Sequence, residues 1–170
     1  MREIQTLLLI DDNEHFCEMI QELLPLYWHG PQLTILTAFS MEDGITAMKN
    51  TEIDIILLDL RLPGHSSMGT VQGIVHALEQ MRAYIPVILL SAYMGDINTS
   101  DALRLGIQEA IHKQGADLLE NIVKAIQSAW SRHNYIEERL AIMRSMDRTN
   151  GGHAGFASDD GNDHDATIAS

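Results

Sequence analysis

Residues 6–12 read TLLLIDD, in which four successive apolar residues lead into Asp11 and Asp12. The pattern returns in IILLD at residues 55–59, where a second apolar run ends in Asp59. A short run that is apolar throughout is typical of a strand buried on both faces of a parallel sheet. Because parallel strands present their carboxyl ends at one edge, the two stretches predict carboxylates gathered in one crevice.

Two further expected strands end in polar groups of other kinds. Residues 86–91, PVILLS, end in Ser91, and residues 108–113, QEAIHK, end in Lys113. Three crowded carboxylates resist full ionisation unless a cation joins them, and hard oxygen ligands favour Mg²⁺ or a similar ion. A lysine and a hydroxyl beside that cluster complete an anion site, so the four strand ends predict an active site.

The whole chain alternates short apolar runs with helical patterns, which predicts βα units packed on a parallel sheet. Pro25 is expected to end the first helix, because proline cannot continue regular helical hydrogen bonding. The fifth strand is less apolar than the others and is expected at an edge of the sheet. The expected strands are 6–10, 33–39, 53–58, 86–90 and 107–111, and the expected helices are 13–24, 41–49, 70–82, 96–105 and one that begins near 117.

Composition limits the classes of function. The chain has 170 residues, 45% of them hydrophobic, which is enough to bury one substantial core. Its formal net charge of −13, without a basic stripe, argues against direct nucleic-acid binding. The sequence lacks a secretory pattern and an apolar stretch of membrane-spanning length, and its single cysteine, Cys17, is interpreted as core filler. We therefore expect a cytoplasmic protein that contacts neither nucleic acid nor membrane.

In this order, and with the third strand followed by LDLRLPG at 58–64, the strand ends resemble a known family. It is the CheY-like receiver domain of bacterial two-component response regulators. The resemblance implies an α/β fold, a doubly wound five-stranded parallel sheet in the flavodoxin-like order 2-1-3-4-5 with five helices. The apolar spacing after residue 117 predicts that the last helix is extended. It covers about residues 7–131 and rests on Asp11, Asp12, Asp59, Ser91 and Lys113.

The resemblance implies that Asp59 is the phosphoacceptor. As a nucleophile it would take a phosphoryl group from the phosphohistidine of a histidine kinase, giving a mixed anhydride that water later hydrolyses. Mg²⁺ would be the cofactor. The family pattern implies that Asp11, Asp12 and Asp59 hold this ion together with the backbone carbonyl of Arg61.

The same pattern implies that Ser91 and Lys113 contact the transferred group. Phosphoryl transfer depends on in-line positioning and on neutralising charge over the equatorial oxygens, more than on an acid or a base. Lys113 would supply a compact positive charge, and Ser91 would hydrogen-bond the phosphoryl group and pull its own loop inward. That movement would be the switch.

Three departures from the family pattern qualify this reading. Ala110 stands where receivers usually carry Tyr or Phe, so the aromatic rotamer switch is expected to be absent. Gln114 stands where proline is common, so the preceding lysine is expected to be aimed less rigidly. The loop over residues 64–69 holds about three extra residues and is expected to gate the site. Arg61 and Tyr93 lie where family members vary, and we expect modest control of dephosphorylation there.

The chain is expected to contain three parts. A stand-alone receiver domain is expected over residues 1–131, an extension of the last helix over 132–148, and a disordered acidic tail over 149–170. An apolar spacing of three and four continues through the extension. It is interpreted either as a seam that pairs two protomers as a short coiled coil or as a frayed helix end.

Two classes of function stay open. The first is a signalling receiver that is phosphorylated on Asp59 by a sensor histidine kinase or phosphotransfer protein and presents a changed face to an unknown downstream protein. Its chemistry would be limited to its own phosphorylation and slow dephosphorylation. The alternative is a pseudo-receiver, a constitutive protein-interaction module, which Ala110 and Gln114 suggest. A small-molecule hydrolase using Asp59 is remoter, because no substrate-pocket motif supports it, and fold alone does not decide.

Overall fold

The computed structural model describes residues 3–93, 95 and 99–150. Its centre is a five-stranded parallel sheet in the order β2-β1-β3-β4-β5, which confirms the predicted doubly wound fold. Among the described residues, those up to Tyr135 form one compact unit, and those from Ile136 onward belong to a second. The strands are β1 (Thr6–Ile10), β2 (Thr34–Ala38), β3 (Ile55–Asp59), β4 (Val87–Ser91) and β5 (Glu109–His112), and the helices are α1 (Glu14–Tyr27), α2 (Met41–Asn50), α3 (Ser67–Met81), α4 (Thr99–Arg104) and α5 (Leu118–Asn150).

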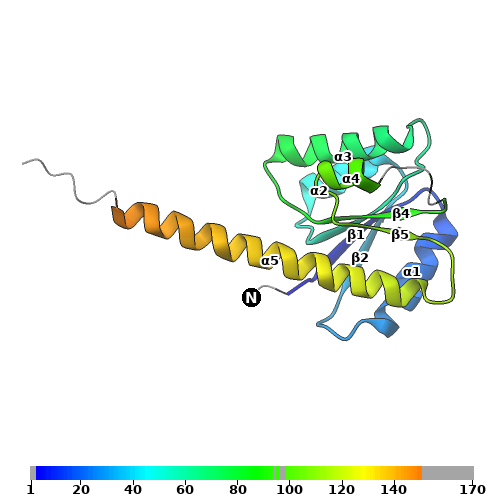
Figure 1. Ribbon diagram of the computed structural model, residues 1–170. Helices are drawn as coiled ribbons and strands as arrows, with labels where there is room; N and C mark the ends of the chain where they lie inside the picture. Colours follow the sequence, from blue (N-terminus) through cyan, green and yellow to red (C-terminus); the bar gives the residue numbers. More distant parts are fainter. Residues whose placement is uncertain (1–2, 94, 96–98, 151–170) are drawn as a thin grey trace, which may run out of the picture. The chain divides into compact units, whose positions relative to one another are not determined.

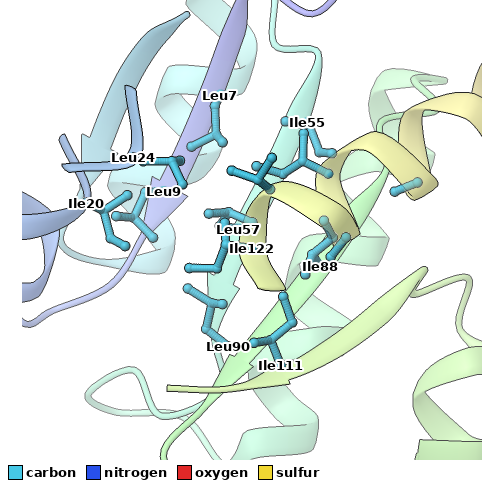
Figure 2. Close-up of a cluster of buried hydrophobic side chains, with 14 of the residues drawn as sticks. Leu7, Leu9, Ile20, Leu24, Ile55, Leu57, Ile88, Leu90, Ile111 and Ile122 are labelled. Carbon is cyan, nitrogen blue, oxygen red and sulfur yellow. The ribbon is translucent and has the colours of Figure 1, made fainter. Parts of the chain in front are cut away.

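In the first unit the sheet lies between two layers of helices, with α1 and the first turns of α5 on one face and α2, α3 and α4 on the other (Figure 1). Successive strand residues alternate between the two faces. Leu7 and Leu9 pack against α1 and α5, whereas Leu8 and Ile10 pack against α2 and α3. Figure 2 shows the first of these clusters, which includes Leu7, Leu9, Ile20, Leu24, Ile55, Leu57, Ile88, Leu90, Ile111 and Ile122.

The three central strands explain why their apolar runs are continuous. Every residue of β3 and β4 is buried, and so is every residue of β1 after the first, because helices cover both faces. Burying one Leu or Ile side chain contributes about 1.5–3 kcal/mol, so these runs account for much of the stability of the sheet. β2 and β5 are only partly buried, and β5 lies at an edge, as predicted.

A buried acid lies at the start of β3. Asp54 is 4% exposed, and its Oδ2 accepts hydrogen bonds from the backbone N–H groups of Gln5 at 2.8 Å and Thr6 at 2.9 Å. Its own N–H donates to the Thr6 carbonyl at 2.9 Å. Asp54 therefore ties the entry of β3 to the entry of β1 at the amino edge of the sheet. It is not among the residues singled out from the sequence.

Helix α1 is longer than predicted. The expected end at Leu24 is wrong, because α1 runs through Pro25 to Tyr27. A proline in a helix lacks one N–H donor, and in the last turn this loss leaves the preceding hydrogen bonds intact. The Trp28 amide then donates to the Pro25 carbonyl at 3.4 Å and closes the turn.

Helix α3 begins earlier than predicted, at Ser67 instead of Thr70. Its N-cap is Ser66, whose Oγ accepts a hydrogen bond from the Gly69 N–H at 3.1 Å. The expected long loop over residues 64–69 is therefore wrong in part, because its last three residues form the first turn of α3. The connection between β3 and α3 is therefore shorter than the sequence pattern indicated.

The other elements differ from their predictions mainly at their ends. Helix α4 begins at Thr99, and the earlier part of its predicted range, residues 96–98, lies outside the described residues. Gly106 follows α4 with φ +88°, a conformation that favours glycine. The expected tail over 149–170 starts too early, because α5 includes residues 149 and 150. Its remainder, residues 151–170, is outside the described part of the chain.

The second unit contains the continuation of α5. Within it, Ile136, Leu140 and Met143 are exposed and keep the spacing of three and four residues that the sequence indicated. Pairing of two protomers through this seam stays a prediction. Among the helices of the described residues, none combines the length and apolar character needed to cross a membrane.

Candidate functional site

The polar residues predicted to form a site all lie at the carboxyl edge of the sheet. Asp11 follows β1, Asp59 is the last residue of β3, Ser91 is the last of β4, and Lys113 follows β5. The strand register aligns these ends, since Asp59 pairs with Leu90 across the β3–β4 ladder. The Lys113 N–H donates to the Ser91 carbonyl at 2.8 Å, which fixes the lysine beside the end of β4.

Three carboxylates share this edge. One oxygen each from Asp11, Asp12 and Asp59 lies within 4.8 Å of the others. Asp11 is completely buried and Asp59 is 5% exposed, whereas Asp12 is open to solvent. Two backbone amides orient the buried pair: Asn13 N–H donates to Asp11 Oδ1 at 3.0 Å, and Arg61 N–H donates to Asp59 Oδ1 at 3.3 Å.

Lys113 lies between the two buried carboxylates. Its Nζ is 2.5 Å from Asp11 Oδ2 and 3.0 Å from Asp59 Oδ2, and its side chain is 13% exposed. The same ammonium lies 4.7 Å from the centre of the Phe16 ring, a cation–π contact. One partly buried cation therefore neutralises part of the charge of two buried anions. Its charged atom lies at the end of a flexible side chain.

Burial is the largest influence on the pKa of Asp11. It raises the pKa of Asp11 above the ordinary value of 3.8, although hydrogen bonding and charge attraction from Lys113 lower it. The ionised Asp11 is thus held at a cost to folding. Burial, reinforced by the charge of Asp11, also raises the pKa of the Cys17 thiol to about 12. Cys17 is 1% exposed and stays a protonated core residue.

The carboxylate cluster has the chemistry of a divalent-cation site. Its donors are hard oxygens, which suit Mg²⁺ better than a softer ion. The positive charge of a cation beside Asp11 would also lower the pKa of that residue and so oppose the effect of its burial. Asp11, Asp12 and Asp59 are therefore the residues that could hold the ion. The backbone carbonyl of Arg61, expected as a further ligand, belongs to the segment that directly follows β3.

Ser91 is engaged within its own loop. Its Oγ donates to the Tyr93 carbonyl at 2.6 Å and accepts from the Tyr93 N–H at 3.0 Å. Such local bonds are typical of a serine in a turn. The Arg61 guanidinium lies 4.3 Å from the centre of the Tyr93 ring, so the segments that follow β3 and β4 touch through these side chains. Both residues were expected to influence dephosphorylation, and that expectation stays a prediction.

One residue beside the cluster was missed in the sequence. The His112 ring bridges the Ala92 carbonyl, at 2.9 Å from Nε2, and the Gln114 N–H, at 3.3 Å from Nδ1. The sequence did contain an indication of its role, because His112 is a polar residue at a strand end, directly before the predicted lysine. Ala110, which stands where receivers usually carry an aromatic residue, is exposed.

Comparison with known proteins adds a family to this geometry. Residues 7–127 match the family described as the response regulator receiver domain. The regulatory protein VanR of Enterococcus faecium is 27% identical over 106 residues, which are 62% of this chain and 42% of VanR. The nitrate/nitrite response regulator protein NarL of Escherichia coli is 27% identical over 140 residues, 82% of this chain and 61% of NarL. The chain thus spans less than two thirds of each of these relatives.

Solved structures agree on the fold. A response regulator receiver domain protein from Clostridium thermocellum superposes with a TM-score of 0.63 at 24% identity, covering 78% of this chain and 99% of that one. The crystal structure titled FixJ-N gives a TM-score of 0.60 at 20% identity, with 77% and 96% covered. At these identities the likeness concerns the arrangement of strands and helices.

Proposed function

This chain belongs to the response regulator receiver family of two-component signalling systems, and from that premise we propose that Asp59 is its phosphoacceptor. The donor would be the phosphohistidine of a sensor histidine kinase or a phosphotransfer protein, the partners with which receiver domains interact. One observation carries the proposal: the partly buried Lys113 reaches two buried carboxylates at the ends of different strands, with Nζ–O distances of 2.5 and 3.0 Å.

In the proposed reaction a carboxylate oxygen of Asp59 attacks the phosphorus atom in line with the bond to the donor imidazole nitrogen. A P–O bond forms, the P–N bond breaks, and its electron pair returns to the imidazole. Water later cleaves the resulting acyl phosphate and releases inorganic phosphate. The orientation of Asp59 is supported by the Arg61 N–H, which occupies one carboxylate oxygen at 3.3 Å and leaves the Lys113 side of the group for the transfer.

Receiver domains generally bind Mg²⁺ at their acidic pocket, and here Asp11, Asp12, Asp59 and the Arg61 carbonyl would hold it. When bound, the ion supplies positive charge that offsets the charge on the transferring group. The carboxylate of Asp11 is already oriented by the Asn13 N–H, and the exposed Asp12 leaves this side open to solvent. The site is therefore suited to taking up a hydrated ion from solution.

Lys113 and Ser91 would respond to the new charge. Once Asp59 carries a phosphoryl group, the Lys113 ammonium would pair with a phosphoryl oxygen in place of Asp59 Oδ2. The Ser91 hydroxyl now donates to the Tyr93 carbonyl at 2.6 Å, and it would exchange this acceptor for the phosphoryl group. That exchange would move the segment after β4 and alter the face formed by α4, β5 and α5.

The test is incubation with acetyl phosphate and Mg²⁺, with intact-mass detection. We expect the mass of one phosphoryl group on the unmodified chain and none on Asp59→Asn. Asp54→Asn is the matched control, because Asp54 is a second buried aspartate on the same strand segment but at the opposite edge of the sheet. It should label like the unmodified chain.

The fluorescence of Trp130 on α5, recorded in a Trp28→Phe background, reports whether the output face changes. A mass gain with a fluorescence change supports a working switch. A chain that gains no mass under conditions that label other receivers would contradict the phosphoacceptor proposal and leave the pseudo-receiver. Equal labelling of Asp59→Asn would contradict the choice of residue.

A further inference from the structure

His112 joins the two segments that carry the phosphate-binding groups. It is the last residue of β5 and pairs in register with Ser91, the last residue of β4. Ala92, whose carbonyl lies 2.9 Å from His112 Nε2, follows Ser91 directly. Gln114, whose N–H lies 3.3 Å from His112 Nδ1, follows Lys113 directly. The ring therefore touches the backbone one residue beyond each of the two groups.

These two contacts define the protonation of the ring. A carbonyl oxygen only accepts, so the nitrogen facing Ala92 must carry a hydrogen. A backbone N–H only donates, so the nitrogen facing Gln114 must present a lone pair. Both conditions hold only for the neutral imidazole with its hydrogen on Nε2. The two neighbours select one tautomer, and that tautomer makes both bonds at once.

We propose that His112 is a positioning residue for phosphoryl transfer, which holds the Ser91 and Lys113 segments in fixed relation through the Ala92 carbonyl and the Gln114 amide. The inference rests on the function proposed above and assigns no contact between His112 and the phosphoryl group. Lys113 is a flexible cation, and its N–H already bonds the Ser91 carbonyl at 2.8 Å. The His112 bridge adds a second link between the same two segments, and this link is made by a side chain.

The residue at position 114 makes this arrangement available. The bond to Nδ1 needs a backbone N–H, which glutamine has and proline lacks. Gly115 follows with φ +122°, a conformation that favours glycine, so the chain turns away immediately after the bridge. The segment after Lys113 is thus held by the hydrogen bond from the Gln114 N–H to the His112 ring. It is held there just before Gly115, a residue type whose backbone can adopt many conformations.

The test compares three substitutions in the full chain, with the rate constant of phosphorylation by acetyl phosphate and Mg²⁺ as the readout. His112→Ala removes both bonds, and we expect a fall on the order of tenfold, because small misplacements of reacting groups are costly. His112→Gln keeps a donor for the Ala92 carbonyl, and His112→Asn keeps an acceptor for the Gln114 amide. Each should recover part of the loss.

His76→Ala is the matched control, since His76 is an exposed histidine on α3, away from the sheet edge. It should leave the rate unchanged, and urea unfolding should show all variants folded at the assay temperature. The inference is overturned if His112→Ala phosphorylates like the unmodified chain, or if Gln and Asn are no better than Ala. Failure of the unmodified chain itself to be phosphorylated would instead overturn the proposed function.

A second readout does not depend on phosphorylation. Long-range ¹H–¹⁵N correlation spectra distinguish the two neutral tautomers of histidine. We expect the His112 signals, assigned by their loss in His112→Gln, to show hydrogen on Nε2 and a lone pair on Nδ1. Hydrogen on Nδ1 would break both hydrogen bonds on which the positioning role depends, and would overturn the inference.

Discussion

Two buried aspartates at opposite edges of one sheet are contacted by different kinds of groups. Asp54, at the amino edge, receives two backbone N–H groups at 2.8 and 2.9 Å. Asp11, at the carboxyl edge, receives one backbone N–H at 3.0 Å, and its second oxygen faces the ammonium of Lys113. The first carboxylate is bound to groups that cannot leave without unfolding, whereas the second depends on a side chain that can move.

The difference separates a carboxylate that stabilises the fold from one that costs stability. Backbone amides are fixed dipoles supplied by the strands themselves, so Asp54 is satisfied as soon as β1 and β3 pair. At the carboxyl edge burial outweighs the attraction of Lys113, and the pKa of Asp11 is raised. Strain of this kind collects at functional sites, because a site that is already satisfied gains little from binding a ligand.

The largest effect on this comparison should come from Asp54→Ala. It leaves the amides of Gln5 and Thr6 without their acceptor, and we expect a loss of about 2–3 kcal/mol in the free energy of unfolding. Urea denaturation measures it. Asp54→Asn keeps an acceptor oxygen and should lose about 1 kcal/mol or less. A loss as large for Asn as for Ala would show that the charge, and not the hydrogen bonds, is what the amino edge requires.

A smaller effect of opposite sign is expected for Asp11→Asn. Removing a buried carboxylate whose pKa is raised should increase the free energy of unfolding by about 1 kcal/mol without Mg²⁺, while Lys113 keeps its contact with Asp59.

The same variant should respond less to Mg²⁺. At about 100 times its dissociation constant, Mg²⁺ should stabilise the unmodified chain by about 2.7 kcal/mol and the Asp11→Asn variant much less. Thermal unfolding with and without Mg²⁺ checks both. Destabilisation by Asp11→Asn would remove the contrast between the two edges.

The smallest effect concerns pH. Because the pKa of Asp11 is higher in the folded chain than its ordinary value of 3.8, the folded state binds the Asp11 proton more tightly than the unfolded state. The cost of ionising Asp11 is therefore fully present above the folded pKa and disappears as the pH falls below 3.8. The stability advantage of Asp11→Asn should shrink toward zero over this range. An advantage that stays constant down to that pH would assign it to packing instead of charge.

The sheet and the positions of the candidate site residues were open to prediction because they depend on strong, local patterns. The continuous apolar runs of β1, β3 and β4 follow from burial on both faces, and each run leads directly into a residue of the candidate site. Helix ends depend on single hydrogen bonds, such as the Ser66 cap of α3, which many serines could make. This is why the start of α3 was placed three residues late.

The residues missed in the sequence are those whose role depends on partners far along the chain. Asp54 bonds amides that lie 48 and 49 residues away, and His112 bonds a carbonyl that lies 20 residues away. A buried acid before an apolar run and a histidine after one are ordinary in composition. Only the register of β1 with β3 and of β4 with β5 brings their partners into reach.

The burial of Cys17 has a practical consequence for measuring the proposed conformational change. The chain contains one cysteine, and its thiol is buried, with a pKa raised to about 12, so thiol-reactive dyes and spin labels should leave the folded protein unmodified. A single cysteine introduced at an exposed position, such as His76 on α3, would then carry the label alone. The movement of any chosen surface segment can be followed in the natural sequence background without first removing a core residue.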